Sequence, residues 1–351
     1  MDREGKLVER IAREFRYGAA EEHASRGSAL RLGIGDDAAV ISSSGKNDWV
    51  LSCDAFLEGV HFLAKTHPPD SVGYKSLVRA TSDLAAMGAT PRYFLLTLAI
   101  PETCTGDWLN QFLKGMARAA RSMKMILAGG DTTKGDTVSI SVTVLGEVAR
   151  RRAVPRSGAR AGDIIYVSGR LGRAQLGLEL LLHGNGNIQG KGPPAKSVRH
   201  TEDVLLTILQ AHLCPQIRLA LGAWLAKHRL ASAMIDLSDG LSTDLTRLCQ
   251  ASGVGAEIHA AAIPVLALPA GLSKYKGRFK LDPLQMALNG GEDYELLFTV
   301  PRRKVKTLRA APGFSQLTPI GEVTGAKKVV LVGPHGAKKP LKPQGWDPFR
   351  R

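Results

Sequence analysis

Residues 233–250 read AMIDLSDGLSTDLTRLCQ, an apolar run that leads into two closely spaced aspartates and then into a helical pattern. The apolar residues before Asp236 predict a buried strand, and the pattern after Gly240 predicts a helix that extends to Gln250. Asp236 and Asp239 lie in the turn between these elements, where a short carboxylate stays close to the backbone. The segment therefore predicts an α/β chain with a candidate site at the end of a strand.

Strands and helices alternate through the rest of the chain. Outside 233–250 the expected elements are helices over 1–15, 72–87 and 108–121, strands over 50–54, 94–100, 125–128, 138–148, 163–168 and 294–300, and a polar loop over 183–197. A basic stretch with Pro and Gly over 149–162 separates two such groups. We therefore predict two α/β domains, residues 1–150 and 151–351, rather than a helix bundle or a β-sandwich.

Composition limits the class of protein. The 351 residues carry a formal charge of +15, which is compatible with nucleic-acid binding, but aromatic residues make up only 5% and do not interleave with the basic runs. We interpret the excess as basic surface that attracts anionic metabolites, and expect no specific nucleic-acid partner. The four cysteines show no metal-ligand spacing, and neither a signal peptide nor a membrane-spanning run is evident. A cytoplasmic protein without a membrane partner is expected.

Acidic residues recur beside glycine or another small residue at expected strand ends. The segments are Gly35-Asp36-Asp37, Ser52-Cys53-Asp54, Ser82-Asp83, Gly129-Gly130-Asp131 and Asp236-Leu237-Ser238-Asp239. A single such aspartate is usually a helix cap or a turn residue. Five together favour a shared cluster, and carboxylate oxygens suit Mg²⁺, which in turn suits phosphates. No GxxxxGK[ST] phosphate loop occurs.

Seven segments together resemble one family. They are GIGDDAAVI (33–41), SCDAFLEGVHF (52–62), SDLAAMGATP (82–91), LAGGDTT (127–133), RSGARAGD (156–163), IDLSDGLSTDL (235–245) and GGEDYELLFTV (290–300). In this order they resemble the thiamine-monophosphate kinases of the PurM-like superfamily. The LSDG and GGD elements occur across that superfamily, whereas GGEDYELLF and DLAAMGA point to the kinase.

The resemblance implies a fold and an activity. The fold is α/β (α+β) and PurM-like, with two α/β domains: an N-terminal ferredoxin-like sheet that forms a barrel in a homodimer, and a C-terminal α/β sandwich-type domain. The activity is phosphorylation of thiamine monophosphate to thiamine diphosphate by ATP, through direct in-line transfer assisted by several Mg²⁺ ions. Since a phosphate monoester is already largely ionised at neutral pH, no acid/base residue is expected.

The resemblance also implies roles for residues at matching positions. Metal ligands would be Asp37, Ser52, Cys53, Asp54, Asp83, Asp131, Asp236 and Asp239. ATP contacts would be Gly130, Asp131, Arg156 and Ser238, and substrate contacts would be His61, Glu292 and Trp346.

The chain departs from the family pattern at two places. Cys53 replaces the usual Thr, and a thiol is a poor Mg²⁺ ligand, so the exchange is harmless only if the backbone carbonyl is the ligand. Arg79-Ala80-Thr81 stands where the family commonly has an apolar residue and Asn. Three alternatives remain open: a cyclo-ligase or selenophosphate synthetase of the same superfamily, a basic nucleic-acid-binding protein, and a paralogue that has lost activity.

Overall fold

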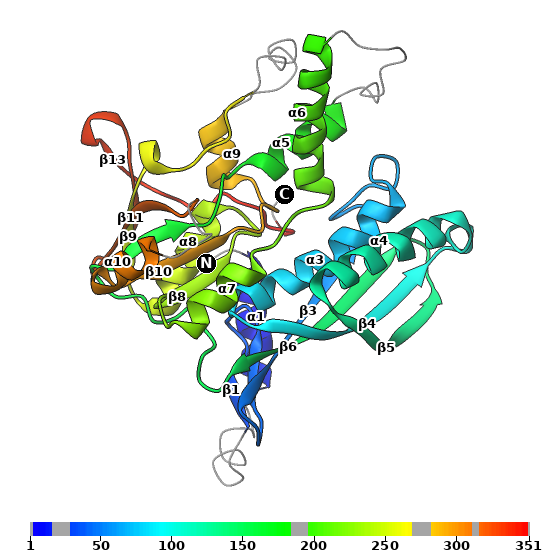
Figure 1. Ribbon diagram of the computed structural model, residues 1–351, viewed down its shortest axis with the longest axis horizontal. Coiled ribbons are helices and arrows are strands. Elements are labelled where there is room, and N and C mark those ends of the chain that lie inside the picture. The colour runs from blue at the N-terminus through cyan, green and yellow to red at the C-terminus, as the bar shows by residue number, and fades with distance from the viewer. Residues whose placement is uncertain (1–2, 16–28, 184–195, 269–281, 311–315, 350–351) are drawn as a thin grey trace.

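The computed structural model describes residues 3–15, 29–183, 196–268, 282–310 and 316–349, which form two mixed sheets (Figure 1). The first sheet has the order β1-β2-β3-β6-β4-β5, from β1 (Leu30–Leu32), β2 (Ala39–Ser42), β3 (Asn47–Leu57), β4 (Thr90–Ile100), β5 (Ile126–Lys134) and β6 (Ser139–Ala149). The second has the order β13-β12-β9-β11-β7-β10-β8, from β7 (Ile164–Val167), β8 (Ala233–Asp236), β9 (Gly255–His259), β10 (Leu296–Val300), β11 (Thr318–Thr324), β12 (Val329–Val332) and β13 (Lys338–Pro340).

Helices connect and cover these strands. The α-helices are α1 (Arg3–Glu14), α3 (Pro69–Ala86), α4 (Asp107–Met123), α5 (Arg173–His183), α6 (Lys196–Leu213), α7 (Leu219–Lys227), α8 (Leu241–Ser252), α9 (Pro283–Asn289) and α10 (Val305–Arg309). Short 3₁₀ turns are η1 (Glu102–Cys104), η2 (Ala260–Ala262), η4 (Arg302–Lys304) and η5 (Pro334–Gly336). Most strand pairs are antiparallel, but β4 and β5 are parallel neighbours joined through α4, and β9 and β12 are also parallel. In the part of the chain that is described, no helix could cross a bilayer.

The helix α3 is the central element of the molecule. It contacts β3, β4, β6 and α4 of the first half and α7 and β8 of the second. Its residues are buried on nearly all sides, including the polar Lys75, Thr81 and Ser82. Glycine permits the close approach of α3 to α4, because a Cβ on Gly73 would lie 2.0 Å from the carbonyl oxygen of Phe112. A helix enclosed in this way can hold charged side chains at fixed positions between the two sheets.

The main hydrophobic core spans both sheets. Leu77 and Leu84 of α3 belong to the same buried cluster as Tyr166 of β7 and Phe298 of β10. A second buried cluster lies between the second sheet and α8 and includes Leu245. In the first sheet, every second residue of β6 is buried and most of the residues between are only half-buried, because successive side chains of a strand point to opposite faces. The packing therefore unites the two α/β halves, and the predicted boundary at 150/151 stays a prediction.

The structure corrects the positions of three acidic residues. The predicted strand 125–128 was expected to end before Gly129-Gly130-Asp131, but β5 continues through this segment because Gly130 and Asp131 pair with Leu96 and Thr97 of β4. Asp54 lies inside β3 and Asp83 lies inside α3. The expectation that the acidic residues all lie at strand ends is therefore wrong for these three.

Smaller differences concern element ends. The predicted strand 294–300 begins at Leu296, because Tyr294 has a left-handed backbone with φ +48°. Of the predicted loop 183–197, residue 183 ends α5, residues 196 and 197 begin α6, and the rest lies outside the described residues.

Candidate active site

Three of the predicted metal ligands meet between the sheets. Asp37 lies in the turn before β2, Asp83 in the last turns of α3, and Asp236 at the end of β8. One carboxylate oxygen from each lies within 4.8 Å of the others. We call Asp37, Asp83 and Asp236 the acidic cluster.

The acidic cluster is electrostatically unfavourable without a cation. Two carboxylate charges about 4.8 Å apart repel by roughly 3.5 kcal/mol at an effective dielectric constant of about 20. Burial and then the charge of Asp37 raise the pKa of Asp236 to about 7, and burial followed by repulsion from Asp54 and Asp236 raises the pKa of Asp83 well above its usual value. The buried Oδ2 of Asp37 accepts no hydrogen bond from the described residues. Closely spaced carboxylate oxygens that repel one another fit a divalent cation such as Mg²⁺, which would offset their charge.

Strand β3 adds two polar side chains to the cluster from one face. Ser52 donates a hydrogen bond to the carboxylate of Asp83, and Asp54, two residues further on the same face, accepts one from Nε of Arg79 at 3.0 Å. Both residues therefore lie beside the acidic cluster, and their role as ligands stays a prediction.

Cys53 points the other way. Its thiol lies 3.4 Å from Oγ of Ser141 and accepts a hydrogen bond from Oγ1 of Thr143 at 3.3 Å, on the opposite face of the sheet, because successive side chains of a strand alternate. The side chain of Cys53 is therefore not a ligand of the acidic cluster, and a prediction of metal binding at this residue applies only to its backbone carbonyl.

The structure does not bring the other two predicted ligands into the acidic cluster. Asp239 forms an ion pair with Arg247, which also contacts Glu4 of α1 at 3.0 Å. Asp131 is exposed on β5, at the edge of the first sheet far from β8 in Figure 1, and its carboxylate accepts a hydrogen bond from the backbone N–H of Thr132. A metal-binding role for either residue stays a prediction.

Arg156 is the predicted ATP contact that reaches the acidic cluster. Its guanidinium donates to Oδ1 of Asp37 at 2.7 Å, and its backbone N–H donates to the carboxylate of Asp36 at 3.1 Å. Burial and the charge of Asp37 raise the pKa of Asp36 to about 6. Arg156 therefore offsets part of the negative charge of the cluster and is placed to bind an anion there.

Gly130 and Ser238 have local explanations in the fold. A Cβ on Gly130 would lie 1.8 Å from the carbonyl oxygen of Leu96, so the approach of β5 to β4 requires glycine. The carbonyl of Ser238 accepts a hydrogen bond from the backbone N–H of Glu292 at 2.8 Å. This bond joins the turn after β8 to the GGEDYE segment. Contacts of both residues with ATP stay predictions.

The predicted substrate contact Glu292 is held in a fixed position. Its backbone is left-handed, with φ +68°, and its carboxylate accepts a hydrogen bond from the fully buried Lys75 at 2.8 Å. Burial raises the pKa of Glu292, but the charges of Lys75 and His212 outweigh burial and bring it to about 2. Glu292 therefore presents a permanent negative charge, which suits a cationic ring such as thiazolium.

His61 and Trp346 complete the predicted substrate contacts. Nδ1 of His61 accepts the backbone N–H of Leu57 at 3.0 Å, and burial, followed by the charge of Arg79, lowers the pKa of His61 to about 4. The ring is therefore neutral, with its proton on Nε2. Trp346 is fastened by its backbone N–H to the carbonyl of Asp239 at 2.9 Å, while its side chain stays half exposed.

Two cations of the site, the buried Lys75 and the partly exposed Arg79, were not predicted. Lys75 and Arg79 precede Asp83 at intervals of four residues on α3, so the three share one helix face. Arg79 also stacks over the ring of Phe56, 5.4 Å from its centroid. The signal available in the sequence was this four-residue spacing of charged residues within the helix.

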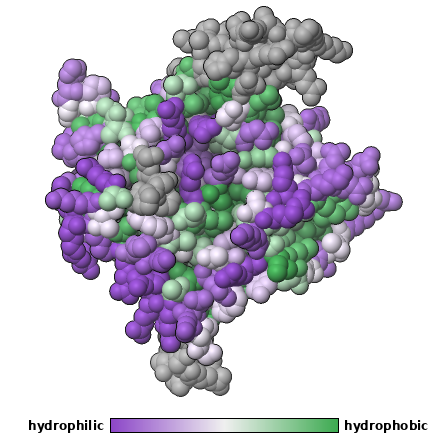
Figure 2. Space-filling view, viewed as in Figure 1, coloured by the Kyte–Doolittle hydropathy of each residue, from purple (hydrophilic) through white to green (hydrophobic). Residues whose placement is uncertain are grey.

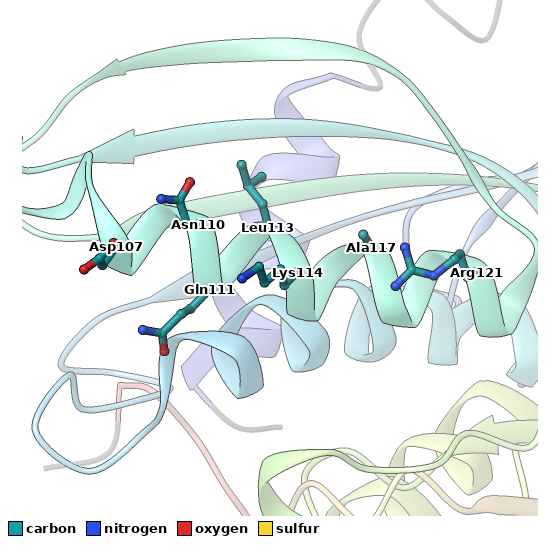
Figure 3. Close-up of a pocket in the computed structure, with 7 residues that line it drawn as sticks. All are labelled: Asp107, Asn110, Gln111, Leu113, Lys114, Ala117 and Arg121. Atoms are coloured by element: carbon teal, nitrogen blue, oxygen red, sulfur yellow. The ribbon is translucent and has the colours of Figure 1, made fainter.

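A surface hollow lies elsewhere and has no predicted site residue in its wall. It follows the outer side of α4 between Asp107 and Arg121 (Figure 3). The enclosed acidic cluster is therefore the better candidate for chemistry.

Known proteins similar to this chain match it over most of its length. Residues 35–148 match the family model of the AIR synthase related protein N-terminal domain, and residues 160–333 match that of the C-terminal domain. Thiamine-monophosphate kinase of Aquifex aeolicus is 35% identical over 90% of this chain and 92% of its own. The enzyme of the same name from Escherichia coli is 36% identical over 91% and 92%.

Solved structures agree with this result. AaThiL complexed with AMPPCP and TMP is 34% identical, with a TM-score of 0.75 over 93% of this chain and 94% of that one. Thiamine-monophosphate kinase from Stenotrophomonas maltophilia has a TM-score of 0.71 at 34% identity over 91% and 96%. The hydrogenase maturation protein HypE of E. coli, at 23% identity and a TM-score of 0.63 over 84% and 86%, shows the same fold. The expected PurM-like, two-part α/β fold is thus confirmed.

Proposed function

This chain belongs to the thiamine-monophosphate kinase family, and from that premise we propose that it transfers the γ-phosphoryl group of ATP to thiamine monophosphate, forming thiamine diphosphate and ADP. The observation that carries the proposal is the acidic cluster, which lies between Arg156 on one segment and the Lys75–Glu292 pair on another. A relative of 34% identity, complexed with AMPPCP and TMP, supports both substrates.

The chemical obstacle is repulsion between two phosphate groups. At neutral pH an oxygen of the acceptor phosphate is already ionised, so it can attack the γ-phosphorus without a general base. The bond between the γ-phosphorus and the bridging oxygen breaks, a bond to the acceptor oxygen forms, and ADP leaves with the electron pair. We propose that this transfer is direct and in line, without a phosphoenzyme.

The residues of the chain would bind and align the two substrates. Divalent cations such as Mg²⁺, held by the acidic cluster and assisted by Asp54, would neutralise charge between the phosphates. Arg156 would bind the phosphates of ATP, and Glu292 would hold the cationic thiazolium with its negative charge. His61 and Trp346 would border the same ligand. The proposal also includes metal binding by Asp131 and Asp239. It further includes contacts of Gly130 and Ser238 with ATP.

We also propose a homodimer built through the first sheet. The edge strand β5 is exposed along its whole length, with Ile126 62% and Leu127 53% exposed. Leu95 of β4 is also exposed, and Figure 2 shows apolar surface over this region. Exposed apolar edge strands invite pairing with another chain. The four unpaired cysteines support a cytoplasmic location as part of the proposal.

A chromatographic assay of thiamine diphosphate tests the reaction. The protein is incubated with ATP, Mg²⁺ and thiamine monophosphate, alongside Asp83→Asn and the control Asp163→Asn. Asp163 is also a buried carboxylate, but it bonds Ser232 at 2.6 Å outside the site. Product from the wild type and from Asp163→Asn, with none from Asp83→Asn, is expected. No product from a folded wild type would refute the proposed reaction, and a labelled phosphoenzyme would refute direct transfer.

A further inference from the structure

Three charged residues follow one another along one face of α3. Lys75, Arg79 and Asp83 follow at intervals of four residues, so neighbouring members of the row are about 6 Å apart along the helix axis. Lys75, at one end of this row, holds Glu292 at 2.8 Å, and Glu292 is the proposed thiamine contact. Asp83, at the other end, belongs to the acidic cluster. Arg79 therefore lies between the part of the site that would hold thiamine and the part that would hold the phosphoryl donor.

The guanidinium of Arg79 is held at this place by several contacts. Nε donates to Asp54 at 3.0 Å, the group stacks on the ring of Phe56, and only 17% of the side chain is exposed. The ring of Phe56 in turn lies 5.7 Å from that of His61. Among the described residues, the guanidinium donates a hydrogen bond through Nε alone, so the N–H groups of Nη1 and Nη2 remain for a ligand.

Arg79 and Arg156 make the same kind of contact in the site. Arg156 rests on Asp37 and Arg79 rests on Asp54, so each guanidinium contacts a carboxylate at or beside the acidic cluster. A cation that engages these carboxylates would satisfy their charge and leave both guanidinium groups for phosphate oxygens. The arrangement supplies one arginine for the donor and one for the acceptor.

We propose that Arg79 binds the phosphate group of the acceptor and thereby selects thiamine monophosphate over thiamine. This inference rests on the proposed function. The acceptor must extend from Glu292 to the acidic cluster, and its phosphate then passes the one cation that α3 places between them. Guanidinium groups bind phosphate through paired N–H donors, which gives them both strength and orientation.

Ligand affinity in two variants tests the inference. Binding of thiamine monophosphate and of thiamine is measured by calorimetry with Mg²⁺ and AMPPCP for the wild type, Arg79→Gln and Arg79→Lys. Arg118→Gln is the matched control, because Arg118 also pairs with an aspartate (Asp70, 3.4 Å) and stacks on an aromatic ring (Tyr74, 4.8 Å), but outside the site. Arg79→Gln is expected to weaken binding of the monophosphate by roughly 10- to 100-fold and leave thiamine binding unchanged. Arg79→Lys should lie between, and Arg118→Gln should match the wild type.

Several outcomes would overturn the role of Arg79. Equal losses for both ligands in Arg79→Gln, or unchanged binding of the monophosphate, would show that Arg79 selects nothing. Mn²⁺ affinity, followed by electron paramagnetic resonance, should stay the same or rise in Arg79→Gln, because a positive charge beside Asp54 is removed. A loss of Mn²⁺ affinity equal to the loss for the monophosphate would show that Arg79 acts through the metal. The two proposals can also fail separately. If the wild type binds the monophosphate better than thiamine, Arg79→Gln does not, and the wild type forms no thiamine diphosphate, then the role of Arg79 is supported and the kinase reaction is refuted.

Discussion

Replacing Asp236 with asparagine should make the metal-free protein more stable at pH 8 and abolish its response to Mg²⁺. Asp236 is only 3% exposed and lies within 4.8 Å of both other carboxylates of the acidic cluster. Ser82 donates a hydrogen bond to it at 2.6 Å, and an asparagine oxygen can accept the same bond. The substitution therefore removes a charge and keeps the shape. Sites that need a ligand commonly lower the stability of the empty protein in this way.

The size of the effect follows from the pKa of Asp236, which rises from 3.8 to about 7. Because the folded protein holds the proton more tightly than the unfolded chain, this group stabilises the fold below pH 3.8, and that contribution is lost as the pH rises through about 7. The loss of stability between pH 3.8 and about 7 amounts to about 4 kcal/mol. This is close to the roughly 3.5 kcal/mol of repulsion between two carboxylate charges of the acidic cluster. We expect Asp236→Asn to gain about 2–4 kcal/mol at pH 8, less than half of that at pH 5, and almost nothing below pH 3.8, where the carboxyl is neutral in both states.

The assay is urea denaturation at pH 5 and pH 8, with and without Mg²⁺, together with the thiamine diphosphate assay. Asp163→Asn is again the control. Its Oδ2 accepts hydrogen bonds from Ser232 and from the backbone N–H of Arg160, and an asparagine oxygen can accept both, so Asp163→Asn should change stability by a similar amount at both pH values and leave the Mg²⁺ response intact. If Asp236→Asn is less stable than the wild type at pH 8, or if Mg²⁺ still stabilises it, the reasoning about the acidic cluster is refuted.

Three further predictions concern other parts of the molecule. Lys75→Met should cost about 3 kcal/mol of unfolding free energy because it leaves the charge of the half-buried Glu292 without its lysine partner. Adding Glu292→Gln should restore part of this loss, and denaturation curves of the single and the double variant check both expectations. Burial lowers the pKa of His67 to about 4 and of His212 to about 3, so stability should fall as the pH drops from 6.5 towards 4, with a smaller slope in His212→Gln; equal slopes would contradict this. Ile126→Lys, on the exposed strand β5, should shift the protein to monomers in sedimentation, and an unchanged distribution would count against the proposed interface.

Local patterns in the sequence predicted most of the elements. The apolar run before Asp236 and the helical pattern after Gly240 correspond to β8 and α8, and the pattern over 72–87 corresponds to α3. These predictions succeeded because a short apolar run is typical of a buried strand, and a longer pattern that ends at glycine is typical of a helix. The motifs also singled out short carboxylates beside small residues, and three of these carboxylates meet in the acidic cluster.

The spatial relations among those residues were decided by tertiary structure. Asp37, Asp83 and Asp236 are far apart in the chain and meet only because α3 packs between both sheets. Asp131 carries the same type of motif and lies instead on an exposed edge strand, because β5 pairs with β4. Strand pairing and helix packing depend on contacts between segments that are distant in the sequence, so the local periodicity of the sequence does not predict them. The sequence by itself thus determined the elements and the kinds of side chain available, whereas only the fold decided which carboxylates share a site and which cation, Arg79, lies between its two halves.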